Sequence, residues 1–249
     1  MNFLIIFVLG LIIGSFNNLC IDRIPRGESI IFPPSRCENC GERLKPIDLI
    51  PVLSYFFLQR KCRHCHASLS WRDPVIEILT GLLFVIIYYC FPSVERFLPY
   101  VTFGSILVII SFIDLDCFRI PDSLIITGLI IGTGFNIFFY FIYWSQAIIG
   151  FLVGGGTLLL IALASGGGMG GGDIKLGAMI GFYLGWQGFL LTLFLGALFA
   201  SIVGIFCIIS KKKSKKDAIP FGPFLSMGAI INLILGGKLI NYYILTFFF

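Results

Sequence analysis

The stretch Ala164–Leu176 reads ASGGGMGGGDIKL, with six glycines among the seven residues Gly166–Gly172 and a single acid, Asp173, after them. It separates two strongly apolar runs. Ordering a glycine backbone costs more conformational entropy than ordering any other residue. So dense a run in an apolar chain is therefore either a flexible connector or a backbone that another molecule must approach closely. The rest of the sequence decides between these two interpretations.

The composition excludes a soluble domain. Hydrophobic residues make up 57% of the 249 residues, charged residues only 12%, and the mean hydropathy is +0.97. A soluble domain carries roughly 25% charged residues. The chain also contains repeated apolar runs long enough to cross a hydrocarbon core of about 30 Å. We therefore predict an all-α polytopic membrane protein.

About eight transmembrane helices are expected. The first, residues 2–20, is interpreted as a retained span, because no basic segment precedes it and no small-residue cleavage site follows it. A long polar segment, residues 21–74, comes next. The remaining expected spans are 75–92, 98–113, 123–143, 147–165, 175–187, 188–209 and 222–245, of which 175–187 is short for a bilayer.

The basic residues orient these spans. With eight crossings, all 18 basic residues except Arg96 and Lys238 fall on one side, and the positive-inside rule makes that side the cytoplasm. The run Lys211–Lys216 (KKKSKK) is interpreted as a topology anchor in contact with anionic membrane lipid. The excess positive charge therefore does not indicate a nucleic-acid partner.

The polar segment carries a metal-binding pattern of two CxxC pairs: Cys37 with Cys40, and Cys62 with Cys65. Two such pairs can supply the four thiolates of a tetrahedral structural zinc site, and a reducing cytosol disfavours disulfides. His64 and His66 stand beside Cys65 and are potential replacements for one sulfur, although bystander histidines are more common in such loops. The pattern predicts a cytoplasmic zinc-binding loop between the first two spans.

Two acids at the cytoplasmic ends of spans form the candidate catalytic pair. Asp114 continues the third span, and Asp173 begins the sixth. The small residues Gly177, Gly181 and Gly185 recur every fourth position after Asp173 and predict close helix packing, which we expect to be against the third span. Two neighbouring carboxyl groups can share one proton, so that one activates water while the other polarises a carbonyl. Helix capping by both acids is the alternative interpretation.

Other charged residues near this pair have simpler interpretations. Asp116 is expected to be solvated, and Asp122 follows Pro121 as a helix-capping residue would. Lys175 either screens the acidic pair or is simply one of the basic residues that the positive-inside rule places on the cytoplasmic side. The dipole of the helix that starts near Asp173 favours the ionised form of this residue, and hence Asp173 as the base and Asp114 as the acid, without settling the assignment.

Several motifs in order resemble those of the bacterial type IV prepilin peptidases, which are GxGD intramembrane aspartic proteases. The resemblance covers nearly the whole chain. It rests on GSFNN at 14–18, RIPRGES at 23–29, the CxxC pairs, DLIPVLS at 48–54, Glu77, Asp114 with IPD at 120–122, GGGD at 170–173 and PFGP at 220–223.

The resemblance implies a protease that removes the basic leader of prepilins and pseudopilins after a glycine, on the cytoplasmic side of the bacterial inner membrane. It implies Asp114 and Asp173 as catalytic residues and the four cysteines as zinc ligands. We expect Gly170, Gly172, Asp116, Asp122 and Lys175 to support the catalytic pair. It also implies N-methylation of the new N-terminus with S-adenosylmethionine as methyl donor, for which no residues are assigned. The corresponding parts are a first helix at 1–20, a zinc loop at 21–74 that is the candidate methyltransferase region, and a protease core at 75–249.

Other functions remain open from the residues alone. One alternative is a non-enzymatic membrane scaffold whose zinc loop docks a partner. Another is a GxGD protease with different clients, although such proteases lack the cysteine loop. A transporter is disfavoured because its coupling sites usually lie at mid-depth in the bilayer, whereas Asp114 and Asp173 are expected at a membrane face. The sequence names neither the client pilins nor an oligomeric state.

Overall fold

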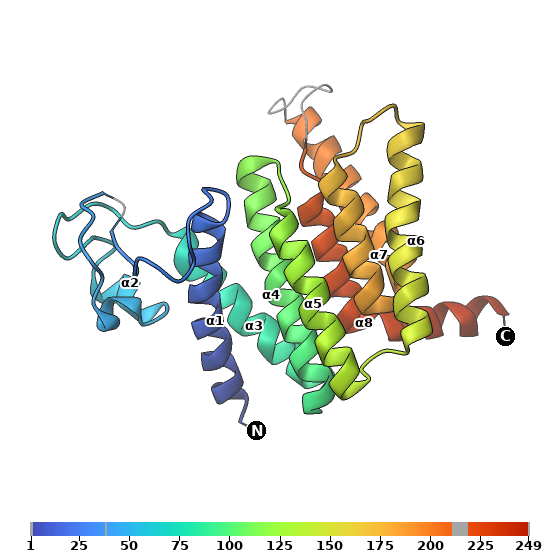
Figure 1. Cartoon of the computed structure of the whole chain (residues 1–249), viewed down its shortest axis with the longest axis horizontal. Coiled ribbons are helices and arrows are strands. Elements are labelled where there is room, and N and C mark those ends of the chain that lie inside the picture. The colour runs from blue at the N-terminus through green and yellow to red at the C-terminus, as the bar shows by residue number, and fades with distance from the viewer. Residues whose placement is uncertain (1, 38, 211–218, 249) are drawn as a thin grey trace. The chain divides into compact units, whose positions relative to one another are not determined.

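The structure is a computed structural model that describes residues 2–37, 39–210 and 219–248, with side chains described as far as Gly236. The chain divides into two compact units, Met1–Ser93 and Val94–Phe249. Every regular element in the described residues is helical (Figure 1). The elements are α1 (Phe3–Arg23), the 3-10 helix η1 (Pro46–Leu49), α2 (Leu53–Phe57), α3 (Arg72–Cys90), α4 (Val94–Cys117), α5 (Asp122–Phe139), α6 (Trp144–Ala164), α7 (Gly171–Ile209) and α8 (Gly222–Phe248).

In the first unit, α1 packs closely against α3. A Cβ added to Gly10 would lie 2.7 Å from the Cα of Gly81, so the two backbones approach as closely as glycine permits. Near the ends that join the polar segment, the contact becomes polar, because Asn17 Nδ2 donates to Thr80 Oγ1 at 3.3 Å in a buried position. The two helices thus form a hairpin that carries residues 24–71 at one end.

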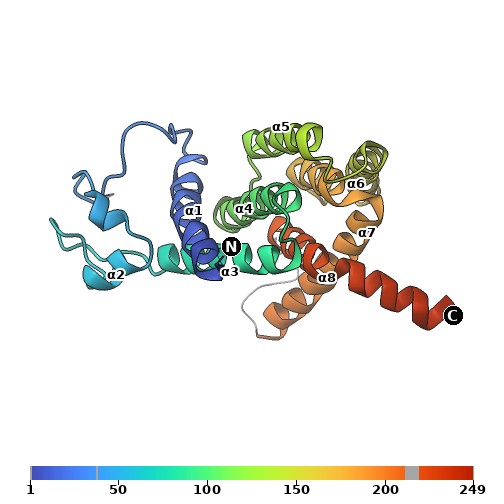
Figure 2. The same cartoon turned by 90° about the horizontal axis from the view of Figure 1, so that it is seen from below.

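In the second unit, glycines set the distance between α6 and α7, which lie side by side in both views (Figures 1 and 2). A Cβ at Gly154 would overlap the carbonyl oxygen of Gly177, and one at Gly150 would overlap that of Gly181. The small-residue face predicted on this helix is therefore used, but its partner is α6. The expectation that it packs against the third span, here α4, is wrong.

A tyrosine links α7 to α4 and α5. Tyr183 is fully buried, stacks on Phe103 of α4 with ring centroids 4.3 Å apart, and donates its hydroxyl to the Gly128 carbonyl of α5 at 2.8 Å. Buried hydroxyl and aromatic surfaces in a membrane core need such specific partners. This contact fixes the rotation of α7 and hence the direction in which its first turn points.

The long helix α7 reverses direction at Gly185, whose φ of 73° and ψ of 172° lie outside the helical region. A Cβ at Gly177 would lie 3.2 Å from Phe189 Cε2, whereas twelve residues of straight helix span about 18 Å. The arms 171–184 and 186–209 therefore fold back on each other, as Figure 1 shows. Gly185 thus serves the reversal, because a positive φ is strained for residues with a side chain.

The expected all-α architecture with apolar helices is confirmed. Among the described residues, six helices are long and apolar enough to cross a membrane, namely α1 and α3–α7, and the apolar helix Gly222–Gly236 is shorter. The number eight is not established by these lengths, because the expected spans 175–187 and 188–209 both fall within α7. The predicted anchor at 211–216 lies outside the described residues.

The α6–α7 contact makes a stability prediction with a matched control on one helix. Gly154→Ala should lower the unfolding free energy by about 1–3 kcal/mol, because its methyl group has no space. Gly156→Ala has no atom within 4 Å of its new Cβ and should be neutral or slightly stabilising. Thermal unfolding of the purified protein in detergent measures both variants, and equal midpoints would contradict the packing described.

Candidate active site and metal centre

Asp114 lies on the last turn of α4 and is 5% exposed. Its Oδ2 accepts a hydrogen bond of 3.1 Å from the backbone N–H of Gly222, the first residue of α8. Free N–H groups at a helix N-terminus carry partial positive charge and stabilise a carboxylate. The start of α8 therefore holds one oxygen of Asp114 in place.

Asp173 lies in the first turn of α7, three residues after the N-cap Gly170. Its Oδ1 is buried and has no hydrogen-bond partner among the described residues. A buried carboxylate oxygen without a partner is costly, and such oxygens in native proteins call for a bound proton, water or ligand. Asp173 thus presents an oxygen with unused capacity to accept a hydrogen bond.

The two acids line one pocket of about 360 Å³ and are close enough to interact electrostatically, although 58 residues lie between them in the chain. The pocket is formed by the end of α4, the connection to α5 and the start of α7. Its lining residues are Asp114, Phe118, Arg119, Ile120, Asp122, Gly170, Gly171, Gly172 and Asp173. An arrangement of two acids in one partly enclosed pocket can bind a proton, a water molecule and a carbonyl group together.

The glycine run has different roles along its length. Gly166 and Gly167 adopt positive φ and end α6, with the Gly167 N–H bonded to the Ala162 carbonyl at 3.0 Å. Gly172 lies against the α4–α5 connection, where a Cβ would be 2.9 Å from Ile120 Cβ. Gly171 lines the pocket with no atom within 4 Å of an added Cβ. The run is thus a helix end followed by a pocket wall without side chains.

The remaining predicted residues lie at or beyond the pocket edge. Asp116 is exposed and is not among the pocket-lining residues. Lys175 Nζ donates to both carboxylate oxygens of Asp122 at 2.7 Å, so this lysine pairs with Asp122. The predicted start of α5 at Asp122 is right, but its capping role is wrong. The N-cap is Pro121, and no side chain caps the helix.

Sequence reasoning missed two features that fix the end of α4 at the pocket. Phe118 ends α4 in a left-handed conformation with φ of 53°, and its N–H bonds to the Asp114 carbonyl at 2.9 Å. Glycine is the usual residue at such a helix end, so the phenylalanine gave no signal. The contact from Gly222 to Asp114 was equally unforeseen, since only a motif resemblance drew attention to residues 220–223.

The four cysteines form a compact group in the first unit, with their sulfur atoms all within 4.8 Å of one another. Cys37 Sγ and Cys65 Sγ are 3.8 Å apart, which matches the edge of a sulfur tetrahedron of about 3.8 Å that follows from Zn–S bonds of about 2.3 Å. The Asn39 amide donates to Cys65 Sγ at 3.5 Å, and this bond is the largest of several contacts that together lower the pKa of the thiol to about 6. The donor set therefore fits zinc. Neither histidine belongs to this group of described residues.

The two cysteine pairs are built as structural repeats. Four residues after the first cysteine of each pair, Gly41 and His66 have positive φ and donate their N–H to the carbonyls of Cys37 and Cys62, at 2.9 and 3.1 Å. Such turns point backbone N–H groups toward the sulfur atoms. In the second pair, His66 occupies the position that glycine fills in the first, which gives it a structural role outside the metal-binding group.

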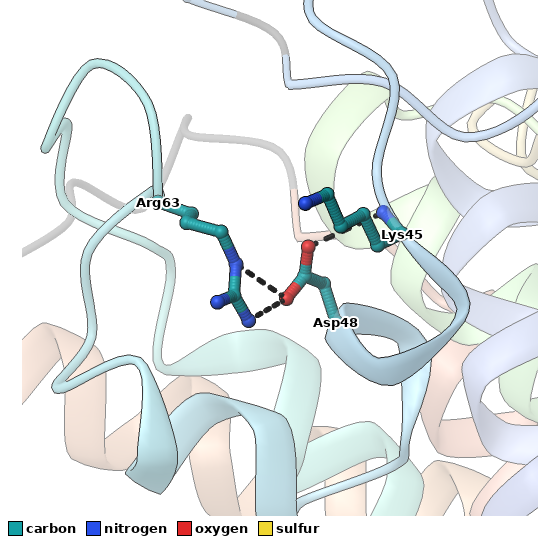
Figure 3. A network of polar contacts seen from close by, with 3 residues as sticks. All are labelled: Lys45, Asp48 and Arg63. Atoms are coloured by element: carbon teal, nitrogen blue, oxygen red, sulfur yellow. Dashed lines mark hydrogen bonds and ion pairs between the residues drawn. The ribbon is translucent and has the colours of Figure 1, made fainter.

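An ion pair joins the second repeat to η1 (Figure 3). The side chain of Asp48 is 3% exposed and accepts from Arg63 Nη2 at 2.6 Å and Nε at 3.1 Å, and from the Lys45 backbone N–H at 3.2 Å. The Arg63 guanidinium holds the pKa of the Asp48 carboxyl below its usual range. Because Arg63 lies between the cysteines of the second pair, this contact ties η1 to the metal-binding turn.

Comparison with known proteins matches both units. Residues 8–91 match the model of the bacterial peptidase A24 N-terminal domain, and residues 101–205 match that of the type IV leader peptidase family. The prepilin leader peptidase/N-methyltransferase of Bacillus subtilis is 34% identical, with 96% of this chain and 97% of that protein covered. The proteins of the same name from Aeromonas salmonicida (98% and 94% covered) and Pseudomonas aeruginosa (95% and 91% covered) are each 31% identical. No solved structure matches the chain significantly.

Similarity at this level extends over both units and over almost the full length of each relative. It includes the segment with the cysteine group and the segment with the two pocket aspartates. With its apolar helices, the chain is a multi-pass protein of the bacterial inner membrane. It belongs to the type IV prepilin leader peptidase family.

Proposed function

We propose that this protein is a membrane aspartic endopeptidase that removes the leader of type IV prepilins and pseudopilins after a glycine, and then methylates the new N-terminus. The names of the relatives support both activities. The observation that carries the proposal is that Asp114 and Asp173 line the same pocket. A scaffold in which the two acids only cap helices does not account for it, because both carboxyl groups line the same pocket and the buried Oδ1 of Asp173 has no hydrogen-bond partner among the described residues.

The pair would act by sharing one proton. The ionised member takes a proton from a water molecule, which attacks the scissile carbonyl carbon, while the protonated member donates a hydrogen bond to the carbonyl oxygen. The proton taken from water is then available to the leaving amine. Both acids lie at helix N-termini, Asp173 in that of α7 and Asp114 against that of α8. The dipole therefore does not distinguish the acid from the base.

The pocket wall suits an extended peptide. Gly170, Gly171 and Gly172 line the pocket with backbone atoms only. Because this wall has no side chains, a substrate backbone can approach Asp173, whose buried Oδ1 is able to accept a hydrogen bond. We infer that the peptide lies along the first turn of α7, with the scissile bond between the two carboxyl groups.

We further propose eight membrane crossings with the pocket on the cytoplasmic side. The reversal at Gly185 makes α7 two crossings, and α8 adds the last. This arrangement returns the start of α7, the end of α4 and the cysteine segment to one side of the membrane. That side carries nearly all the basic residues, as the positive-inside rule requires of the cytoplasm.

The four cysteines would hold a structural zinc ion, and S-adenosylmethionine would supply the methyl group. With four protein ligands the ion has no open position, so its role is to fold the loop. The proposed division assigns methylation to the segment 21–74 and proteolysis to 75–249. The residues that bind the methyl donor are not assigned.

Replacement of either acid should abolish leader cleavage. Asp114→Asn and Asp173→Asn remove the shared proton, and a positioned acid or base contributes about 10²–10⁴-fold to the rate. Asp116→Asn, two residues along the same helix and exposed, is the matched control and should retain activity. The mass of a purified prepilin incubated with enzyme and labelled S-adenosylmethionine reports cleavage and methylation separately. Near-normal cleavage by either pocket variant would refute the assignment.

The two glycines before Asp173 provide a test of the pocket geometry. Gly172→Ala should slow cleavage strongly, because its methyl group displaces Ile120 and the α4–α5 connection that carries Asp122. Gly171→Ala has free space and should retain most of the activity. Single-turnover cleavage rates separate this effect from substrate binding. Equal rates for the two variants would contradict the close contact between Gly172 and Ile120.

The metal proposal predicts one zinc ion per chain. Cys62→Ser should lose it and expose residues 24–71 to proteolysis, because binding energy and folding energy are coupled in such loops. Cys90→Ser, at the far end of α3, is the control and should keep the metal. Elemental analysis and limited proteolysis of the membrane-inserted protein measure both effects. Full zinc occupancy in Cys62→Ser would contradict the four-cysteine site.

A further inference from the structure

A short apolar segment of the cysteine loop faces outward. In residues 46–57, here called the apolar segment, Phe57 is 80% exposed, Phe56 64% and Ile47 60%. Neither η1 nor α2 contributes a buried residue. Surface patches with this density of large apolar side chains mark a site of contact with another apolar phase or partner.

The apolar side chains of this segment do not form a core for the loop. The loop is held together by the cysteine group and by the ion pair between Asp48, the polar residue of the segment, and Arg63. The turn before α2 is fixed separately, because the Val52 N–H donates to Glu77 Oε2 on α3 at 2.6 Å. The phenylalanines of α2 therefore belong to a helix that α3 holds in place, and this helix keeps its position when they contact another surface.

The position of the segment within the first unit indicates what covers it. The loop is tied at both ends to membrane helices, to α1 after Arg23 and to α3 before Arg72. Figure 1 shows α2 on the side of the loop toward the N-terminal end of α1, which is the direction back into the bilayer. A loop tethered in this way cannot move far from the membrane surface.

The charge pattern is that of an interfacial anchor. No charged residue occurs between Asp48 and Arg60, whereas Lys45, Arg60 and Lys61 flank the apolar segment. Residues 24–71 contain seven basic and four acidic residues. Apolar aromatic residues framed by Lys and Arg bind the boundary between lipid head groups and acyl chains, and anionic lipids strengthen the binding.

We propose that the apolar segment inserts into the leaflet beneath the cysteine loop and that this contact requires anionic phospholipid. Phe56 and Phe57 enter the boundary region, and the basic residues beside them contact lipid phosphates. The zinc-binding turns are thereby held at a fixed height above the bilayer. A protein partner would need the same apolar surface, but the membrane tethers and the surrounding positive charge favour lipid. This proposal does not depend on the assignment of the two aspartates.

Tryptophan reporters can test the contact in the full chain. The natural tryptophans (Trp71, Trp144 and Trp186) are replaced by Phe, and zinc content and leader cleavage are checked in that background. Phe57→Trp then reports on the apolar segment, and Glu42→Trp, exposed beside the first cysteine pair, is the control. Both proteins are placed in nanodiscs of phosphatidylglycerol with phosphatidylcholine or of phosphatidylcholine alone, each with lipids brominated in the acyl chains.

In phosphatidylglycerol nanodiscs, Phe57→Trp should show blue-shifted emission and quenching typical of an indole roughly 5–10 Å into the boundary, while Glu42→Trp should not. Adding Lys61→Gln should lower the ratio of docked to undocked loop about fivefold, the equivalent of about 1 kcal/mol for one surface cation. Absent quenching at position 57 would overturn the proposal. Blue-shifted but unquenched emission would assign the segment to a protein contact, and equal quenching in phosphatidylcholine alone would remove the requirement for anionic lipid.

Discussion

The structure depends most on how the first turn of α7 is held. Asp173 stands there with one carboxylate oxygen unpaired in a buried position, a state that only a surrounding rigid frame can maintain. The frame has three parts: the backbone contact of α7 with α6 at paired glycines, the Tyr183 contacts with α4 and α5, and the close fit of Gly172 to Ile120. Each restricts a different movement of that turn. The proposed catalytic geometry therefore depends on helix packing both at the pocket and further along α7, away from it.

Much of this architecture was predictable, because a bilayer permits few structures. Apolar runs in a chain with so few charges must be helices, and the basic residues sort those helices by direction. Asp114 and Asp173 could also be placed on one side of the membrane from the same rules. That they line one pocket required the structure, since no rule of composition places the end of α4 beside the start of α7.

The failures have specific physical causes. The repeat of glycines after Asp173 correctly indicated close packing but carried no information on the partner, because a small-residue face fits any helix equally well. Asp122 resembled a cap, yet it pairs with Lys175, a residue 53 positions away in the chain that local reasoning cannot see. Phe118 and His66 adopt conformations usually reserved for glycine, so neither was recognisable as the end of a helix or as part of a metal-binding turn. The four cysteines were correctly grouped because their spacing alone constrains them.

The proposed membrane crossing by the short first arm of α7 has a consequence for the surrounding lipid. Residues 171–184 span about 21 Å as a helix, against a hydrocarbon core of about 30 Å. Hydrophobic mismatch of this size is relieved by local thinning of the bilayer or by adjustment of the neighbouring helices. Acyl-chain length then becomes a physical variable of the pocket, because thicker membranes raise the elastic cost of keeping Asp173 in contact with water.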